Sequence, residues 1–425
     1  MNKIIILIFF LINTLWANIG TNGDLKVLKE LGLDPSFISD SELVSIYNEY
    51  SSKSKISYFR NILKKSSLNA QIVRAEIENE NLHDAVFFIP MIESSFVNQT
   101  RGKNSPAGLW QIIPDTAKHL KLRNDEFIDE RLDLIKSTDA ASLYLRRYYK
   151  KFDKKWYLSI LAYNSGEGRV IEAITRASID RYLELNPNRN SGLFRSYQRS
   201  LDDYQRTKRG VSSLYGIYGE LQGMEVPFNF EYLVQNNKQK QYLPESTVTY
   251  LKRIVVFSML SNRGLFDDIK KSPYKLEKVK LPKGVSLKSV ASAISFSSSE
   301  LEKMNKHIRK QALPKDSKAN FYIPKSKLEI YNKKIASIKP ISEKKETQAK
   351  KGTDKKETQT KKSVDKKVVD SKKSDKKKVL IYKVKKGDSF ESIAKVYNMS
   401  VKKLKSDNKK KSNLINIGDS IEIYK

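Results

Sequence analysis

A lysine-rich segment constrains the fold of this chain more than any other sequence feature. Residues 342–378 contain 15 Lys and 7 Asp or Glu, include the near-repeat KETQAKK and KETQTKK, and have no aromatic residue. Such a segment cannot bury enough apolar surface to offset the entropy that it would lose on ordering. It predicts a flexible linker, so the chain must fold as separate parts before and after it.

Charge and cysteine content exclude several classes of function. The formal net charge of +32 indicates an anionic partner. No motif that combines aromatic and basic residues accompanies this charge, which argues against nucleic-acid binding. The chain has no Cys and three His, which excludes disulfide bonds and a lipid-modified cysteine and argues against a metal site. We expect no metal, no cofactor and no lipoprotein anchor on a membrane.

The first residues are typical of an export signal. Lys3 supplies a positive charge, and Ala17 is a small residue at a cleavage position. The apolar run Ile4–Ile12 between them is well short of the roughly 20 residues that span a membrane. Residues 1–17 are therefore expected to be a signal peptide, with an uncleaved membrane anchor as the alternative.

One pattern of short elements occurs twice. In residues 379–425, a strand is expected at Ile381–Val384, helical spacing follows Phe390, and a closing strand is expected at Ser420–Tyr424. This order is βααβ. A shift of 103 residues aligns residues 278–324 with it, so these are expected to be a second, divergent copy.

Residues 379–425 resemble the LysM family, whose βααβ modules bind N-acetylglucosamine-containing glycans. The resemblance implies a ligand groove between two loops, formed by Gly387, Asp388, Ser389, Phe390, Leu414, Ile415 and Asn416. Turn glycines and apolar residues also build such a fold, so each of these positions has a structural interpretation as well. In residues 278–324, Val285 replaces the Asp that the family prefers, which leaves sugar binding by this copy open.

The central region, residues 76–181, holds the candidate catalytic residue. An apolar run from Ala85 to Ile92 ends directly at Glu93, which Ser94 follows. Partial burial at the end of such a helix disfavours the charged carboxylate, so Glu93 is expected to hold a proton near neutral pH and to donate it as a general acid. A solvated helix end is the alternative, and the neighbouring motifs decide between the two.

Two further motifs accompany Glu93. In the loop that begins at Gly108, the glycine lets the backbone approach a ligand, and Gln111 offers an amide donor and acceptor. Trp110 is either a sugar-stacking face or a core residue. A helix that begins near Trp156 is expected to end at glycines and to present Tyr163 and Asn164 at its end.

The three motifs together resemble the lysozyme-like lytic transglycosylase domain of glycoside hydrolase family 23, and most closely its murein transglycosylase D branch, which carries LysM modules. The resemblance implies an α+β multidomain chain, with a mainly α-helical catalytic domain followed by small βααβ modules. It implies that Glu93 is the catalytic acid and base. It also implies that the substrate is bound and oriented by Ser94, Gly108, Gln111, Tyr163 and Asn164.

The resemblance also implies the reaction. Most glycosidases use two carboxylates, and these motifs offer one. The acetamide group of N-acetylmuramic acid would replace the second, and the C6 hydroxyl of the same sugar would close a 1,6-anhydro ring. Peptidoglycan strands would thus be cut without water, in the periplasm, by a monomeric lyase. A hydrolytic muramidase of the same fold and a non-catalytic peptidoglycan-binding protein are the alternatives.

The remaining regions carry less chemical information. Residues 18–75 are expected to be helical. Residues 182–275 are expected to be a helical extension with an insertion. Its aromatic residues either line a longer glycan groove or pack an added helical layer; they are Tyr197, Tyr204, Tyr215, Tyr218, Phe228, Phe230 and Tyr232.

Overall fold

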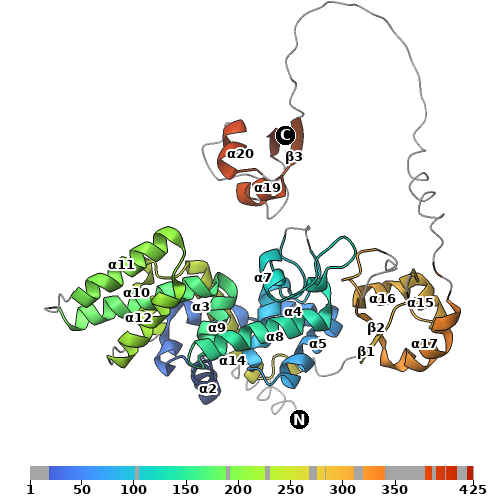
Figure 1. The fold of residues 1–425 in the computed structure, drawn as a ribbon, viewed down its shortest axis with the longest axis horizontal. Coiled ribbons are helices and arrows are strands. Elements are labelled where there is room, and N and C mark those ends of the chain that lie inside the picture. The colour runs from blue at the N-terminus through green and yellow to red at the C-terminus, as the bar shows by residue number, and fades with distance from the viewer. Residues whose placement is uncertain are drawn as a thin grey trace, which may run out of the picture. The chain divides into compact units, whose positions relative to one another are not determined.

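The computed structural model falls into two compact units, one within residues 1–350 and one within residues 351–425 (Figure 1). The structure describes residues 19–100, 105–187, 192–224, 230–267, 275–282, 284–310, 319–338, 340, 379–384, 389–397, 399–408 and 419–424. The expected signal peptide and the lysine-rich segment lie outside these residues. None of the helices in the described ranges is both long and apolar enough to cross a membrane.

The first unit begins with helices that form one side of its core. They are α2 (Asn22–Leu31), α3 (Ser41–Tyr50), α4 (Lys53–Lys65) and α5 (Ser67–Asn79). Thr21 and Asp24 form a capping box at the start of α2, and the Asp40 carboxylate accepts the Leu43 N–H at 2.8 Å to cap α3. These caps satisfy the backbone donors that a helix start leaves unpaired.

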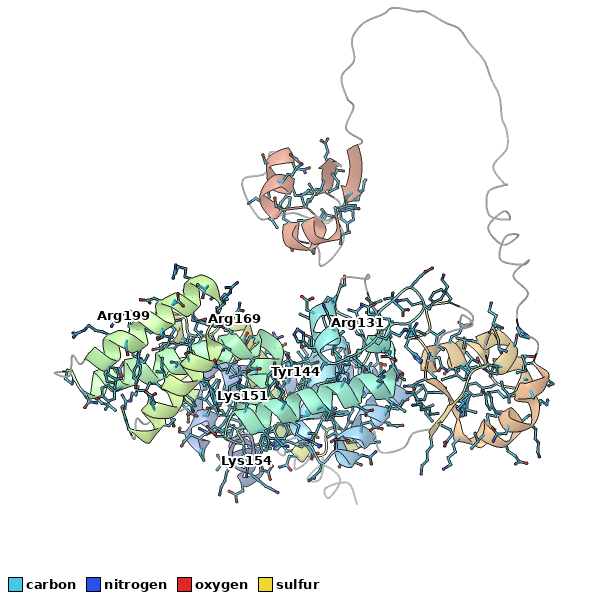
Figure 2. The ribbon with its side chains drawn as sticks, in the orientation of Figure 1. Arg131, Tyr144, Lys151, Lys154, Arg169 and Arg199 are labelled. Atoms are coloured by element: carbon cyan, nitrogen blue, oxygen red, sulfur yellow. The ribbon has the colours of Figure 1, made fainter. Side chains whose placement is uncertain are left out.

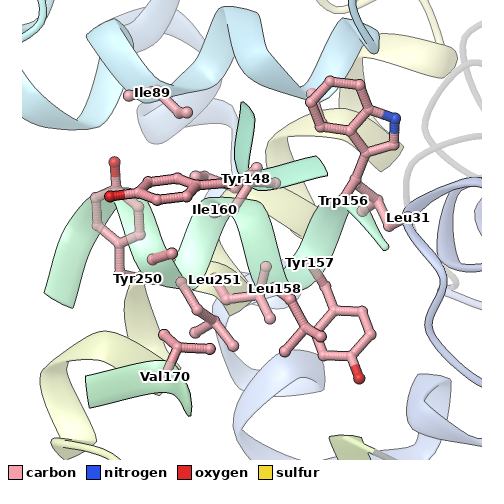
Figure 3. Packing of buried hydrophobic residues seen from close by; sticks show 14 of the residues in the cluster. Leu31, Ile89, Tyr148, Trp156, Tyr157, Leu158, Ile160, Val170, Tyr250 and Leu251 are labelled. Carbon is pink, nitrogen blue, oxygen red and sulfur yellow. The ribbon is translucent and has the colours of Figure 1, made fainter. Parts of the chain in front are cut away.

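The central helices surround α9 (Trp156–Ser165), which is buried from Trp156 through Ala162. Around it pack α8 (Leu134–Lys151), α10 (Glu167–Leu185) and α14 (Glu245–Asn262). Figure 3 shows Ile160 and Leu158 of α9 among Ile89, Tyr148, Val170 and Leu251, which come from the neighbouring helices. A helix that is apolar all round requires such an enclosed position.

A short helix carries the candidate acid. The one-turn 3₁₀ helix η2 (Asp84–Phe87) leads into α6 (Phe88–Ser94), and Pro90 lies in the first turn of α6. The missing N–H of a proline costs little there, because the first-turn donors have no partner within the helix. The apolar run from Ala85 to Ile92 thus changes from 3₁₀ to α geometry just before Pro90. The helix ends at Ser95, whose φ is 51°.

The insertion adds three helices against α10. They are α11 (Gly192–Thr207), α12 (Val211–Gly223) and α13 (Phe230–Lys240). Their aromatic residues are buried in the same core as the catalytic helices, which supports the packing interpretation over a longer glycan groove. The buried members are Tyr197, Tyr204, Tyr218, Phe230 and Tyr232. Tyr215 is half-buried, and Phe228 lies outside the described residues.

A βααβ module ends the described part of the first unit. Strand β1 (Leu276–Val279) pairs antiparallel with β2 (Phe321–Pro324), with Leu276 opposite Pro324. Between them lie α15 (Leu287–Ala293) and α16 (Ser298–Met304), and α17 (Leu328–Lys334) follows. The second unit repeats this order in β3 (Val379–Lys383), α19 (Phe390–Val396), α20 (Val401–Asp407) and β4 (Ser420–Tyr424). The predicted fold class, a mainly helical region followed by small βααβ modules, is confirmed.

The two modules share one set of hydrogen bonds. In the first, Asn305 donates to the Tyr322 carbonyl and accepts the Tyr322 N–H, both at 2.8 Å. In the second, Asn408 makes the same pair of bonds to Glu422, at 2.8 and 2.7 Å. The side-chain amide replaces a strand partner, which explains why the repeat keeps Asn at this position.

Candidate active site

Glu93 lies in the last turn of α6, partly buried, and receives a hydrogen bond from another helix. The phenol of Tyr250, on α14, donates to Glu93 Oε1 at 2.9 Å. Burial raises the pKa of Glu93, and the hydrogen bond from Tyr250 offsets part of that shift. The desolvation expected from the apolar helix is therefore present. The carboxyl is suited to hold a proton at higher pH than an exposed Glu would.

Tyr250 was missed by the sequence analysis. It lies 157 residues beyond Glu93 in the chain, and no local pattern distinguishes it from the other core tyrosines. Burial raises the pKa of Tyr250 well above its usual value, and the charge of Glu93 adds to the shift. The phenol consequently stays protonated and acts as a donor toward the carboxylate.

The side chain of Tyr163 also approaches Glu93, from the end of α9. Its hydroxyl donates to the Trp110 carbonyl at 2.7 Å, and its ring packs edge-on against Trp110 with centroids 6.3 Å apart. Burial raises its pKa, and Glu93 is the largest contributor among the charged groups. The structure therefore brings Glu93, Tyr163 and Tyr250 together from three helices. Asn164, the next residue, is exposed at the end of α9.

The loop that begins at Gly108 is tied closely to its surroundings. Gly108 has φ +79°, and a Cβ there would lie 1.8 Å from the Arg131 carbonyl oxygen, so only glycine fits. Gln111 donates from Nε2 to the Gly108 carbonyl at 2.8 Å. This bond orients the side-chain amide. Gln111 has a positive φ of 47°.

Two residues near this loop have structural contacts. The Ser94 hydroxyl shares its one hydrogen between two carbonyls, that of Leu109 at 2.8 Å and that of Pro90 at 3.0 Å, and thus links α6 to the loop. Trp110 is completely buried, and its Nε1 donates to the Thr138 hydroxyl at 2.9 Å. Of the two interpretations of Trp110, the structure supports the core residue.

Other carboxylates of the central region are engaged elsewhere. Asp129 is fully buried and pairs with Arg131, and Asp133 caps α8 through the Lys136 N–H at 3.0 Å. Glu167 pairs with Lys151. These contacts give Asp129 and Asp133 structural roles, and Glu93 stands as the candidate acid of the site.

The expected glycan groove of the C-terminal module lies only in part within the described residues. Phe390 is completely buried in the module core. Ser389 accepts the Ser392 N–H at 3.2 Å and caps α19. Both residues therefore support the fold. Gly387, Asp388, Leu414, Ile415 and Asn416 lie outside the described residues.

Comparison with protein families divides the chain in the same way as its structure. Residues 71–185 match the transglycosylase SLT domain. Residues 275–340 match the LysM-like domain of lytic transglycosylase MltD, and residues 382–423 match the LysM domain. The chain thus contains an SLT domain followed by two modules of LysM type, as the resemblance implied.

Individual relatives cover parts of the chain. Membrane-bound lytic murein transglycosylase D of Escherichia coli (strain K12) is 37% identical over 150 residues, which are 33% of this chain and 32% of the relative. Peptidoglycan transglycosylase gp16 of Escherichia phage T7 is 30% identical over 179 residues, 40% of this chain and 13% of the relative. A putative tributyltin chloride resistance protein of Alteromonas sp. (strain M-1) is 40% identical over 100 residues, 24% of this chain and 48% of the relative. The similarity to transglycosylase D thus spans about a third of that protein's length.

Proposed function

We propose that this chain, which contains an SLT domain and two LysM-type modules, is a peptidoglycan lytic transglycosylase. It would cleave the β-1,4 bond between N-acetylmuramic acid and N-acetylglucosamine and leave 1,6-anhydromuramyl ends. The observation that carries the proposal is the partly buried Glu93 carboxyl, which accepts a hydrogen bond from Tyr250 and whose charge acts on the buried Tyr163 phenol. The similarity to transglycosylase D supports the same activity.

In the first step, Glu93 acts as a general acid. Its raised pKa favours the protonated carboxyl, which donates its proton to the bridging oxygen as the glycosidic bond breaks. The acetamide carbonyl of the muramyl sugar stabilises the positive charge that develops on the anomeric carbon. Tyr163, Asn164 and Gln111 are the residues proposed to orient that sugar and its neighbour.

In the second step, Glu93 acts as a general base. The carboxylate formed by the first proton transfer takes the proton of the muramyl C6 hydroxyl, whose oxygen bonds to the anomeric carbon. Tyr250 donates to that carboxylate and stabilises the charged form midway through the reaction, when it is needed. Glu93 thus gives up one proton and regains one, and no water enters the product.

The C-terminal module supplies attachment to the substrate. A LysM domain at residues 382–423 supports peptidoglycan binding, and the excess of Lys and Arg favours association with anionic wall polymer. We propose that the protein works at the cell wall in the periplasm. Its named relative is a membrane-bound murein enzyme.

Product analysis of digested murein tests the proposal. The wild type is expected to release muropeptides with anhydro ends, and Glu93→Gln to release none while still sedimenting with insoluble murein. Reducing ends from the wild type would instead identify a muramidase. Equal product release by wild type and Glu93→Gln would remove Glu93 from the chemistry.

A further inference from the structure

The first βααβ module, residues 275–338, makes extensive contact with the SLT domain. Ile128 of the SLT domain forms a β-bridge with Ile308, with Asp129 N–H donating to the His307 carbonyl and Arg309 N–H to the Phe127 carbonyl, both at 2.8 Å. Ile128 is completely buried among the core residues of the module. The SLT domain thus contributes a residue to the core of the module.

A buried ion cluster joins the module to Arg131. The Asp129 carboxylate, fully buried, accepts from Arg131 Nε and Nη2 at 2.9 Å and from Arg309 Nη2 at 2.7 Å. A buried carboxylate is costly unless it is paired and hydrogen-bonded. Arg131 pairs with both carboxylate oxygens of Asp129, and the module supplies a second cation, Arg309.

Arg131, labelled in Figure 2, links Asp129 to the loop that begins at Gly108. Its Nη1 donates to the carbonyls of Ser105 and Ile112, at 2.7 and 3.2 Å. These carbonyls lie on either side of the Gly108–Gln111 turn. The backbone of Arg131 also packs directly against Gly108. A change in the position of Arg131 therefore moves the turn that presents Gln111.

A second path starts at Tyr322. Its hydroxyl donates to Asp133 Oδ1 at 2.9 Å, and Asn320 donates to Asp133 Oδ2 at 3.1 Å. Asp133 caps α8, and Thr138 in the following turn accepts the indole N–H of Trp110. The module thus reaches both the start of α8 and the Trp110 side of the loop.

We propose that the module at residues 275–338 holds the Gly108–Gln111 loop in its substrate-binding position, with Arg309 and Tyr322 as positioning residues. Arg309 acts through Asp129 and Arg131, and Tyr322 acts through Asp133 and α8. The module is then a structural part of the active site. The effect on substrate rests on the proposed function, whereas the effect on the loop does not.

The test uses full-length variants and two readouts. Arg309→Met keeps the aliphatic length and removes the cation from Asp129, and Tyr322→Phe removes one hydroxyl. Lys310→Met is the control, because Lys310 pairs with exposed Glu126 at the same contact, whereas Asp129 pairs with Arg131 and Arg309. Amide hydrogen exchange at residues 107–112 reports the loop, and KM and kcat on soluble glycan chains report substrate binding.

Arg309→Met is expected to speed exchange at residues 107–112 and to raise KM by about 10- to 100-fold, with a smaller change in kcat, because the loop binds substrate and Glu93 is untouched. Tyr322→Phe should change the exchange rate and KM in the same direction as Arg309→Met, but by a smaller factor. Lys310→Met should match the wild type. The Arg309→Met effect on exchange should also occur in a Glu93→Gln background.

Several results would overturn the proposal. The first is that neither Arg309→Met nor Tyr322→Phe changes hydrogen exchange or KM. The second is that Lys310→Met changes them as much as Arg309→Met does. If Arg309→Met unfolds the module, Tyr322→Phe decides, since it leaves every apolar contact in place. A wild type without activity would refute the proposed function, and the exchange readout would still test the loop.

Discussion

The two βααβ modules have the same fold and different surroundings. Both close their sheet with an Asn that pairs with the last strand, Asn305 in one and Asn408 in the other. Three and four residues after that Asn, the first module has Ile308 and Arg309, where the second has Lys411 and Ser412. Ile308 and Arg309 make the contacts with the SLT domain described above.

The difference extends to the closing strand. Tyr322, whose hydroxyl bonds to Asp133, corresponds to Glu422. The residues that dock the first module are therefore absent from the second. The Asp388 that matches the LysM family is Val285 in the first module. The two proposals together assign one fold two purposes in this chain: support of the active site in the first copy, and attachment to the glycan in the second.

Matched core substitutions in the two modules should give the largest difference between them. Phe321→Ala and Ile421→Ala each remove a completely buried side chain from a module, at a cost of about 2–5 kcal/mol. Phe321→Ala should strongly lower cleavage of soluble glycan, because it destabilises the module that packs around Ile128 and carries Arg309. Ile421→Ala should lower sedimentation with insoluble murein and leave soluble cleavage intact. Unchanged cleavage by Phe321→Ala would show that the first module gives the site no support.

Tyr250→Phe tests the chemistry apart from the support by the first module, because the Tyr250 hydroxyl donates to Glu93 itself. The hydrogen bond to a charged carboxylate is worth about 1.5–3 kcal/mol, so kcat should fall by about 10- to 100-fold. Tyr250 lowers the pKa of Glu93, so its removal should raise that pKa. The first step needs protonated Glu93, so the decline of kcat/KM at alkaline pH should move to higher pH. A pH–rate profile with an unshifted alkaline limb would contradict the assigned contact.

The paired asparagines give the smallest expected difference. Asn305 is buried, and its replacement by Ala leaves two backbone groups of Tyr322 without partners, at about 1–3 kcal/mol. Asn408 makes the same bonds at an exposed site, where water replaces them and the loss is about 0.5–1.5 kcal/mol. Amide hydrogen exchange in β2 and in β4 measures the loss of stability in each module. Equal losses would mean that docking adds nothing to the stability of the first module.

Much of this organisation could be predicted from local sequence. The apolar run before Glu93, the glycine at 108 and the repeated Asn each carry a local physical signal. The motif resemblance also brought Glu93, Gln111 and Tyr163 into one site.

Other features depend on contacts between distant residues. Tyr250 lies in an apolar helix whose pattern fits any core tyrosine, and its distance from Glu93 in the chain hides the pairing. The contact of Arg309 with Asp129 spans 180 residues, so no spacing rule predicts it. Trp110 and the insertion tyrosines left two interpretations open, because burial is a property of the folded chain.

The central claim is that Glu93 carries a proton from one oxygen to another while the sugar closes on itself. Digestion of murein in water labelled with heavy oxygen tests this claim most directly, with muropeptide masses as the readout. The account predicts anhydro products without label at the muramyl end, and no products from Glu93→Gln. Heavy oxygen incorporated at the anomeric carbon during cleavage would show that water attacks there, and would contradict it.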